Sequence, residues 1–354
     1  MKSEICWQNR RINRRRLVGS TAAAGLGITL FGAAGLRARA AQDEPYRIVL
    51  IQGVTGDNFY ISMACGAQAA ADELGATLEV QGPERFDATL QAPLLSAVVQ
   101  SAPDAILIAP NDRTAMIGPI QEAIDAGIAV VTVDTSIESD IAIANIASDN
   151  VEGGRIAARA LAELIGETGK VFVINVQPGV STTDQRADGF FEELANYPDI
   201  VDLGQEYSNN DPTQAASLLS AKLQSDPDLA GVFGTNLFSA QGAAVAIEQA
   251  GLQGTIKVVS FDAGPTQVEQ LESGTVDALI AQHPYDIGWT GVQLAVEYLN
   301  TEAPPAETAI TTGYSIVTLE TIDDPEISRY LYVADCSEIA VAEASPEADA
   351  TPVS

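Results

Sequence analysis

The sequence has 354 residues, 46% of them hydrophobic, and its formal net charge at pH 7 is −30. A surface this acidic repels nucleic acid and anionic lipid, so we expect neither as a partner. The length is sufficient for two ordinary domains.

The first 41 residues predict an export signal. Three adjacent arginines at 14–16 precede a moderately apolar run rich in Gly and Ala, residues 17–36, and small residues at 38–41 suit a signal peptidase. Adjacent arginines are typical of twin-arginine export. An uncleaved membrane anchor is the alternative, because about 20 apolar residues can span a bilayer. We expect cleavage after residue 40 or 41 and a periplasmic or other extracytoplasmic protein that is not membrane-embedded.

The mature chain is still more acidic. Removing residues 1–41 takes away eight of the 18 Lys and Arg and one of the 48 Asp and Glu, which leaves a net charge of −37. Cys65 and Cys336 lie far apart in sequence without the spacing of metal ligands. They could pair in an oxidising compartment, but the interpretation that we favour leaves them unpaired. Residues 336–354, rich in Ala, Glu, Pro and Thr toward the end, predict a disordered acidic tail.

From residue 46 onward, short β-branched runs alternate with helical stretches. This alternation predicts an α/β fold with parallel sheets flanked by helices. Apolar residues three and four positions apart predict helices, for example at 61–74, 88–100, 156–164 and 215–223. The predicted strands are residues 47–52, 77–81, 105–109, 129–133, 170–176, 201–207, 231–234, 257–261 and 278–281.

Nine strands are too many for one ordinary open sheet, so we expect two Rossmann-like lobes. The first α/β unit ends near Ile146, and the second begins with a helix that Ser148 or Asp149 can cap. No Gly/Ser linker separates the two units. We therefore expect hinge segments packed against both lobes, which would allow rotation about a few bonds.

Ligands of open parallel sheets bind beyond the carboxyl ends of the strands. The loops at those ends are rich in Asp, Asn and Gln and include one Arg: residues 53–60, 110–112, 134–135, 177–186, 208–211, 235–236, 262–263 and 282–283. Carboxylates accept hydrogen bonds from vicinal hydroxyls, amides donate and accept, and Arg offers a planar fork of donors. Rings such as Phe59, Tyr60 and Phe261 can pack on the C–H faces of a sugar. Any one of these residues could be structural, but the set predicts a sugar or polyol site.

The sequence does not favour catalysis. Its single histidine is His283, and it contains no nucleophile elbow, phosphate-binding loop or zinc-protease motif. Two facing carboxylates could hydrolyse a glycoside, with Asp57 paired with Asp134 or Asp262; this glycosidase alternative is the less favoured one. We expect that the protein is not an enzyme and that it has neither a cofactor nor a metal site.

Seven sequence segments, in order and spacing, resemble the periplasmic sugar-binding proteins of the ribose-binding type, which serve ABC importers. The similarity runs from residue 46 to 318, and its segments are 57–60 with 66–68 and 73–75, 131–134, 146–150 with 153–154, 186–190, 232–233 with Asn236, 259–262, and 280–282 with 286–288. The resemblance implies a type 1 periplasmic binding protein fold. Its first lobe would comprise residues 42–147 and 283–311, and its second lobe residues 148–282 and 312–335.

The resemblance also implies which residues hold the ligand. In the first lobe an aromatic pair and an Asp fall on Phe59, Tyr60 and Asp134; in the second lobe the binding residues fall on Arg186, Asn236, Phe261, Asp262 and Gln282. This sequence departs from the ribose binders at Gly53, Asp57, Thr135 and Asn210, which stand where they have Ser, Asn, Arg and Phe. The candidate ligand-binding residues are Asp57, Asn58, Phe59, Tyr60, Asp134, Thr135, Arg186, Asn210, Asn236, Phe261, Asp262 and Gln282.

The expected function is capture of a monosaccharide or polyol between the lobes and its delivery to a membrane permease with separate ATPase subunits. We expect a monomer. The departures make ribose itself doubtful, and another pentose, a hexose, a deoxysugar or inositol fits the pattern. The alternative is a receptor for a sugar or furanosyl signal that feeds a chemotaxis or kinase sensor. Sugar-responsive repressors share the fold but begin with a DNA-reading helix-turn-helix, where this chain has its predicted export signal.

Overall fold

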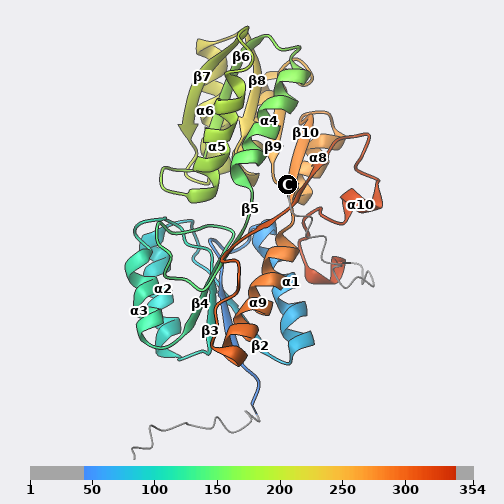
Figure 1. Cartoon of the computed structure of the whole chain (residues 1–354). Helices are drawn as coiled ribbons and strands as arrows, with labels where there is room; N and C mark the ends of the chain where they lie inside the picture. Colours follow the sequence, from blue (N-terminus) through green and yellow to red (C-terminus); the bar gives the residue numbers. More distant parts are fainter. Residues whose placement is uncertain (1–43, 340–354) are drawn as a thin grey trace, which may run out of the picture. The chain divides into compact units, whose positions relative to one another are not determined.

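The computed structural model describes residues 44–339, all of which belong to one compact unit. Within this unit the chain forms two six-stranded sheets, each covered by helices (Figure 1). The two sheets are referred to below as the first and second lobe, together with their helices. The export signal expected at residues 1–41 lies outside the described residues, as do residues 340–354 of the expected tail.

The first lobe is built on an entirely parallel sheet with the strand order β11-β5-β4-β3-β1-β2. Its strands are β1 (Arg47–Ile51), β2 (Thr77–Gln81), β3 (Ala105–Ile108), β4 (Ala129–Val133), β5 (Asn145–Ser148) and β11 (Ala309–Thr312). Its helices are α1 (Asn58–Leu74), α2 (Ala88–Gln100), α3 (Ile117–Asp125) and α9 (Pro284–Thr301).

Alternate residues of β1 enter the two separate cores of the first lobe. Ile48 and Leu50 pack with α1 and α9, whereas Val49 and Ile51 pack with α2 and α3. Side chains alternate between the faces of a strand, so a strand buried on both faces reads as a continuous apolar run. The sequence Ile-Val-Leu-Ile of β1 is such a run.

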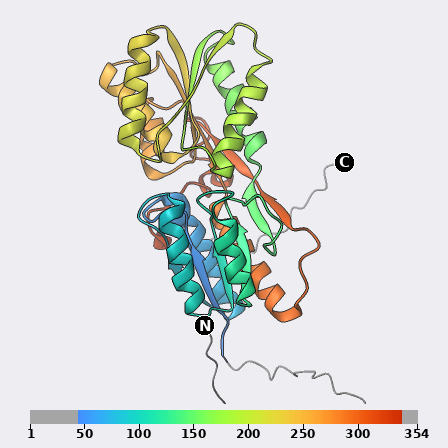
Figure 2. The same ribbon diagram turned by 90° about the vertical axis from the view of Figure 1, so that its left-hand side faces the viewer.

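The second lobe repeats this arrangement with the strand order β12-β10-β9-β8-β6-β7, in which only β12 runs antiparallel to its neighbour. Its strands are β6 (Gly169–Asn175), β7 (Ile200–Tyr207), β8 (Leu229–Gly234), β9 (Lys257–Phe261), β10 (Ala278–Gln282) and β12 (Tyr314–Val317). Helices lie on both faces of each sheet (Figure 2). Those of the second lobe are α4 (Asn150–Leu164) and α5 (Ser181–Leu194) on one face, and α6 (Pro212–Ser225), α7 (Leu237–Ala250) and α8 (Pro265–Glu272) on the other.

The α/β fold class expected from the sequence is confirmed, and all nine predicted strands are present. Three further strands, β5, β11 and β12, were not predicted. Each has only four residues, and each lies where the chain passes from one sheet to the other. No helix within residues 44–339 combines the length and apolar character needed to cross a bilayer.

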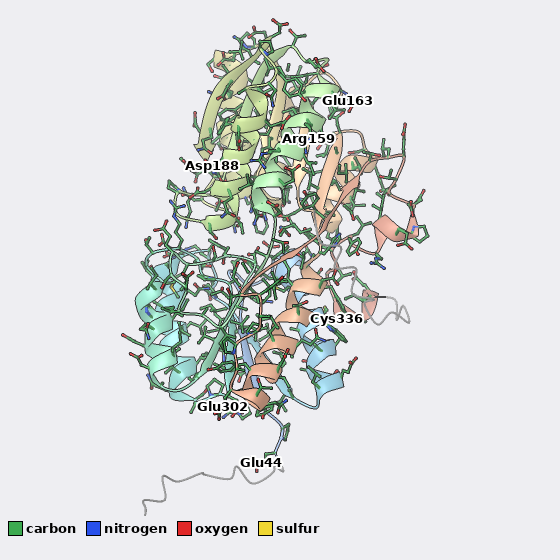
Figure 3. All side chains as sticks on the ribbon, viewed as in Figure 1. Glu44, Arg159, Glu163, Asp188, Glu302 and Cys336 are labelled. Atoms are coloured by element: carbon green, nitrogen blue, oxygen red, sulfur yellow. A yellow bond between two sulfur atoms is a disulfide. The ribbon has the colours of Figure 1, made fainter. Side chains whose placement is uncertain are left out.

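The expectation of unpaired cysteines is wrong. Cys65 on α1 forms a disulfide with Cys336, with their Cα atoms 5.4 Å apart. The pairing arises because the chain after β12 runs through a short helix, α10 (Pro325–Ser328), and returns to α1, where a 3-10 turn, η1 (Cys336–Glu338), begins. The first residues of the tail expected at 336–354 are therefore folded (Figure 3).

Candidate functional site

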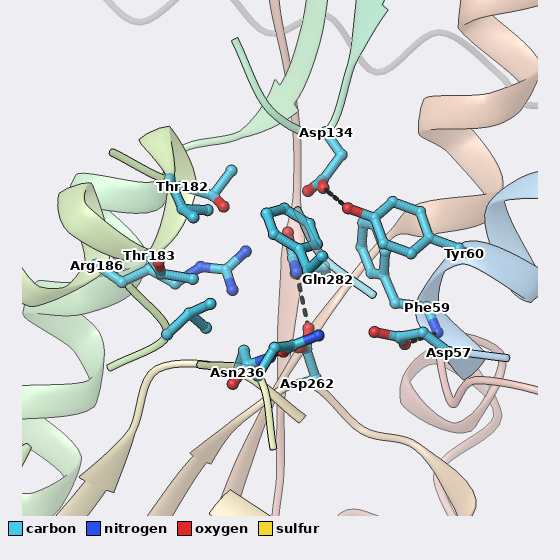
Figure 4. A pocket seen from close by; sticks show the side chains of 14 residues that line it. Asp57, Phe59, Tyr60, Asp134, Thr182, Thr183, Arg186, Asn236, Asp262 and Gln282 are labelled. Atoms are coloured by element: carbon cyan, nitrogen blue, oxygen red, sulfur yellow. Dashed lines mark hydrogen bonds between the residues drawn. The ribbon is translucent and has the colours of Figure 1, made fainter. Parts of the chain in front are cut away.

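A polar pocket lies where loops at the carboxyl ends of strands from both lobes meet (Figure 4). It contains about 390 Å³ of empty space, including the part open to solvent. The lining offers carboxylates, one guanidinium, amides, hydroxyls and aromatic rings. These residues are Asp57, Phe59, Tyr60, Phe86, Asp134, Val176, Val180, Thr182, Thr183, Arg186, Asn210, Asn236, Asp262 and Gln282.

The first wall of the pocket consists of the lining residues of the first lobe: Asp57, Phe59, Tyr60, Phe86 and Asp134. Asp57 caps α1, and its Oδ1 accepts a hydrogen bond of 2.9 Å from the Phe59 backbone N–H. The rings of Phe59 and Tyr60, in the first turn of α1, meet edge to face with their centroids 5.2 Å apart. The start of one helix thus supplies both a carboxylate and apolar ring surface.

The Tyr60 hydroxyl fixes one oxygen of Asp134, to which it donates a hydrogen bond of 2.8 Å at Oδ2. Gly53 makes this contact possible. A Cβ atom at residue 53 would lie 2.3 Å from the Tyr60 hydroxyl oxygen and 2.5 Å from the Phe86 ring. Any residue with a Cβ atom at position 53 would therefore displace Tyr60 or Phe86.

Two buried carboxyls of the first wall have raised pKa values. Burial raises the pKa of Asp57 to about 7, and the nearby negative charge of Asp262 adds to the shift. Burial also raises the pKa of Asp134 to about 6, although the positive charge of Arg186 and the Tyr60 hydrogen bond oppose it. Carboxylates that lack water become better acceptors once donor hydroxyls reach them.

The second wall comprises the lining residues of the second lobe, with Arg186 of α5 at its centre. Arg186 is 2% exposed and points into the pocket (Figure 4). Its Nε donates to Asn150 Oδ1 at 2.8 Å, and its Nη1 donates to the Thr235 carbonyl at 2.9 Å. The guanidinium carbon lies 3.9 Å from the centroid of the Phe261 ring. Hydrogen bonds and ring stacking thus hold the guanidinium in place before any ligand arrives.

Asp262 of the second wall accepts three hydrogen bonds from the protein. Its Oδ1 accepts from Gln282 Nε2 at 2.7 Å and from the Tyr332 hydroxyl at 2.9 Å, and its Oδ2 accepts from the Leu237 N–H at 3.0 Å. Asp262 has φ +77° and Asp134 has φ +63°, in the left-handed region that non-glycine residues rarely adopt. Such strain is concentrated at functional sites, where the surrounding structure enforces it.

Two buried polar atoms of the second wall find no hydrogen-bond partner within residues 44–339. They are the Thr183 hydroxyl oxygen and Gln282 Oε1. A buried polar atom without a partner is costly. A ligand hydroxyl could donate to either atom, so both are candidate contacts for a polar ligand.

The pocket brings together nine of the twelve candidate residues named from the sequence; Asn58, Thr135 and Phe261 are not among its lining. Asn58 faces away and donates to the Val333 carbonyl at 3.1 Å. Thr135 is 1% exposed, and Phe261 is fully buried behind Arg186. Phe261 therefore packs against the Arg186 guanidinium, and the aromatic rings that line the pocket are those of the first wall.

Five lining residues were not singled out from the sequence. Four of them lie in or just before the loop 177–186, which the sequence predicts to be near the ligand because it follows the carboxyl end of a strand: Val176, Val180, Thr182 and Thr183. Valine and threonine are common in every part of a fold, so these residue types alone do not indicate a binding role. Phe86 lies in the loop after β2. This loop follows the carboxyl end of a parallel strand, so its position in the sequence is the signal that points to Phe86.

A second, larger cavity of about 570 Å³, which likewise includes space open to solvent, shares Asp134 and Thr182 with the pocket. Neither an aromatic ring nor an arginine lines it, so it matches a sugar less well. Among the described residues, no group of three or more His, Cys, Asp and Glu is placed to hold a metal ion.

Comparison with known proteins gives matches over most of the chain. Residues 48–303 match the family model described as periplasmic binding protein domain. The ribose import binding protein of Salmonella typhimurium is 32% identical over 260 residues, which are 73% of this chain and 87% of that protein.

Solved structures give the same picture. An ABC transporter solute binding protein from Agrobacterium vitis, bound with α-D-tagatopyranose, is 48% identical, has a TM-score of 0.79, and is aligned over 81% of this chain and 99% of that one. A carbohydrate transporter solute binding protein from Agrobacterium radiobacter, in complex with D-arabinose, is 28% identical with a TM-score of 0.77, and the coverage is 81% and 99%.

Proposed function

Because this chain belongs to the periplasmic binding protein domain family, together with the ribose import binding proteins, we propose that it captures a monosaccharide or polyol in its pocket for an ABC importer. Its relatives are binding proteins for sugar transport, and the chain is accordingly a binding protein and not an enzyme.

The observation that carries the proposal is the division of hydrogen-bonding roles between the two walls. The first wall offers carboxylate oxygens of Asp57 and Asp134, and within residues 44–339 each carboxylate accepts a single hydrogen bond. The second wall offers the Arg186 guanidinium and the unpartnered Gln282 Oε1. A sugar hydroxyl donates and accepts at once, so a polyol can bridge the walls.

Bridging both lobes would couple binding to their relative position. A ligand that contacts both walls favours the arrangement in which the two lie close together, and it does so by its differential affinity for that arrangement. In the proposed cycle, this ligand-bound form docks as a monomer on a membrane permease whose ATPase subunits are separate chains. Export through the predicted twin-arginine signal would place it outside the cytoplasm.

The proposed ligand class is a monosaccharide of five or six carbons. The 48% identical protein holds α-D-tagatopyranose and the 28% identical one holds D-arabinose, which supports a keto- or aldosugar of that size. Asp57, Thr135 and Gly53 depart from the ribose binders, so we do not expect ribose to be the preferred ligand.

A thermal-shift panel of the purified chain tests this proposal. D-tagatose, D-arabinose, D-ribose and myo-inositol are each added at 1 mM, and a ligand present at about 1,000 times its Kd should stabilise the folded protein by about 4 kcal/mol. At least one sugar should raise the melting temperature by several degrees. An Asp134→Ala variant, which lacks a first-wall acceptor, should lose most of this shift; a panel that leaves the parent unmoved would contradict the ligand class.

A further inference from the structure

The C-terminal strap, defined here as residues 332–336, connects the second lobe to α1 of the first lobe. On the second-lobe side, the Tyr332 backbone N–H donates to the Ala263 carbonyl at 3.0 Å. On the first-lobe side, the Val333 N–H donates to the Ser62 hydroxyl at 3.0 Å. The Cys336 disulfide to Cys65 on α1 then anchors the end of the strap (Figure 3).

The Tyr332 side chain reaches the back of the proposed ligand site. It is 4% exposed, and its hydroxyl donates to Asp262 Oδ1 at 2.9 Å while accepting from the Gln282 backbone N–H at 3.0 Å. Its ring meets Phe59 edge to face, with centroids 5.8 Å apart. Tyr332 thus contacts lining residues of both walls, although it does not line the pocket itself.

The hydroxyl of Tyr332 is a dependable donor. Burial and the negative charge of Asp262 raise the pKa of Tyr332 well above its ordinary value, so it keeps its proton at any physiological pH. With its help, Oδ1 of Asp262 has two donors and Oδ2 has one. Without it, Oδ1 retains only the Gln282 side chain, and the carboxylate has more freedom to turn.

We propose that Tyr332 is a positioning residue for ligand binding, which orients the Asp262 carboxylate toward the sugar, and that the Cys65–Cys336 disulfide keeps the strap seated. The inference rests on the proposed function, because it assumes that Asp262 contacts the ligand. Ligand affinity would then depend on a residue that lies outside the pocket lining.

Tyr332→Phe tests the positioning role, since it removes the hydroxyl and keeps the ring. Calorimetric titration with D-tagatose, or with D-arabinose if that is the sugar the parent binds, should show affinity about tenfold weaker than the parent. Tyr330→Phe is the matched control. The Tyr330 ring stacks on His283 and its hydroxyl pairs with Arg329, away from the pocket lining, so its affinity should match that of the parent.

A double-mutant cycle separates positioning from a general loss of stability. If Tyr332 acts through Asp262, adding Tyr332→Phe to Asp262→Asn should weaken binding by less than about twofold beyond Asp262→Asn alone. Additive losses, or a Tyr332→Phe variant that melts at a lower temperature yet binds as tightly as the parent, would overturn the assignment.

Replacing both cysteines, Cys65→Ser with Cys336→Ser, tests the anchor. The unanchored strap should let Tyr332 leave Asp262 part of the time, which weakens binding about threefold or more. Affinity equal to that of the parent would overturn this half of the inference.

Failure of the proposed function can be told apart from failure of the inference. If the parent binds no sugar of the panel, the proposed function fails, and the strap is then judged from ligand-free crystal structures. An Asp262 carboxylate that turns away from Gln282 in Tyr332→Phe supports the positioning role. A carboxylate unchanged from the parent overturns it.

Discussion

Asp134 and Asp262 occupy equivalent places in the two lobes, each directly after the third strand of its sheet in spatial order and each with a positive φ. Their surroundings differ. Asp262 accepts three hydrogen bonds from the protein, whereas Asp134 accepts one from Tyr60 and its neighbour Asp57 accepts one from its own helix. The same position in the fold therefore carries a carboxylate that the protein holds with three hydrogen bonds in one lobe, and a carboxylate held by a single hydrogen bond in the other.

This difference suggests where ligand choice resides. The second wall is organised before binding, so it should hold any sugar that presents hydroxyls at the right places. The first wall has buried carboxylates with raised pKa values, and only a ligand that donates to both of them offsets their lost hydration. We expect substitutions in the second wall to weaken the binding of every sugar, and conservative substitutions at Asp57 in the first wall to alter selectivity with little loss of affinity.

The largest effect is expected from Arg186→Ala. This variant removes the only guanidinium of the pocket lining and leaves the surrounding carboxylates without their positive partner. Loss of one partner from a buried charge pair costs about 3–5 kcal/mol, so affinity measured by calorimetry should fall at least 100-fold. The control is Arg155→Ala, whose half-exposed ion pairs lie outside the pocket lining and which should bind normally. An Arg186→Ala affinity within threefold of the parent would contradict the view that the second wall carries most of the binding energy.

A smaller effect distinguishes the two walls directly. Asp262→Asn turns an amide N–H₂ toward at least one of three donors, which should weaken binding about 30-fold. Asp57→Asn keeps a side chain that caps helices equally well, and it introduces the residue that the sequence resemblance to the ribose binders implies for this position. We expect a change of less than about fivefold for the preferred sugar and a relative gain for D-ribose. Equal losses in both variants, without a change in selectivity, would show that the walls do not differ.

The smallest effect concerns pH. The pKa of Asp57 is raised to about 7 in the folded protein from an ordinary value of 3.8, so its contribution to stability is full below about pH 4 and is lost as pH rises toward 7. Asp57→Asn removes this dependence. Without ligand, it should melt roughly 5 °C above the parent at pH 8 and at the same temperature at pH 4. Parallel melting curves across this range would mean that Asp57 is hydrated in the ligand-free protein.

The sequence predicts most of the fold because the patterns that indicate strands and helices involve residues that are close together in the chain. The apolar runs of the inner strands and the helix caps depend on nearby residues, and they locate the nine longer or more apolar strands. The four-residue strands β5, β11 and β12 lack such a signal, since their pairing is set by where the chain crosses between sheets. The Cys65–Cys336 disulfide is likewise invisible locally, because 271 positions separate its cysteines.

The candidate site was predictable where a charged residue stands in a loop after the carboxyl end of a parallel strand, as at Asp134, Arg186 and Asp262. It was not predictable where the direction in which a side chain points decides whether the residue reaches the pocket. Asn58 and Phe59 are adjacent on α1, yet one faces the strap and the other the pocket. Phe261 is fully buried beneath Arg186, a relation between two elements that sequence spacing does not contain.

Whether one ligand bridges both walls of the pocket is tested most directly by a crystal structure of the chain with the sugar that gives the largest thermal shift. We expect one monosaccharide in the pocket, with hydroxyls donating to Asp134 on the first wall and contacts to Arg186 and Gln282 on the second. A sugar bound elsewhere, or one that contacts the residues of a single lobe only, would contradict this expectation.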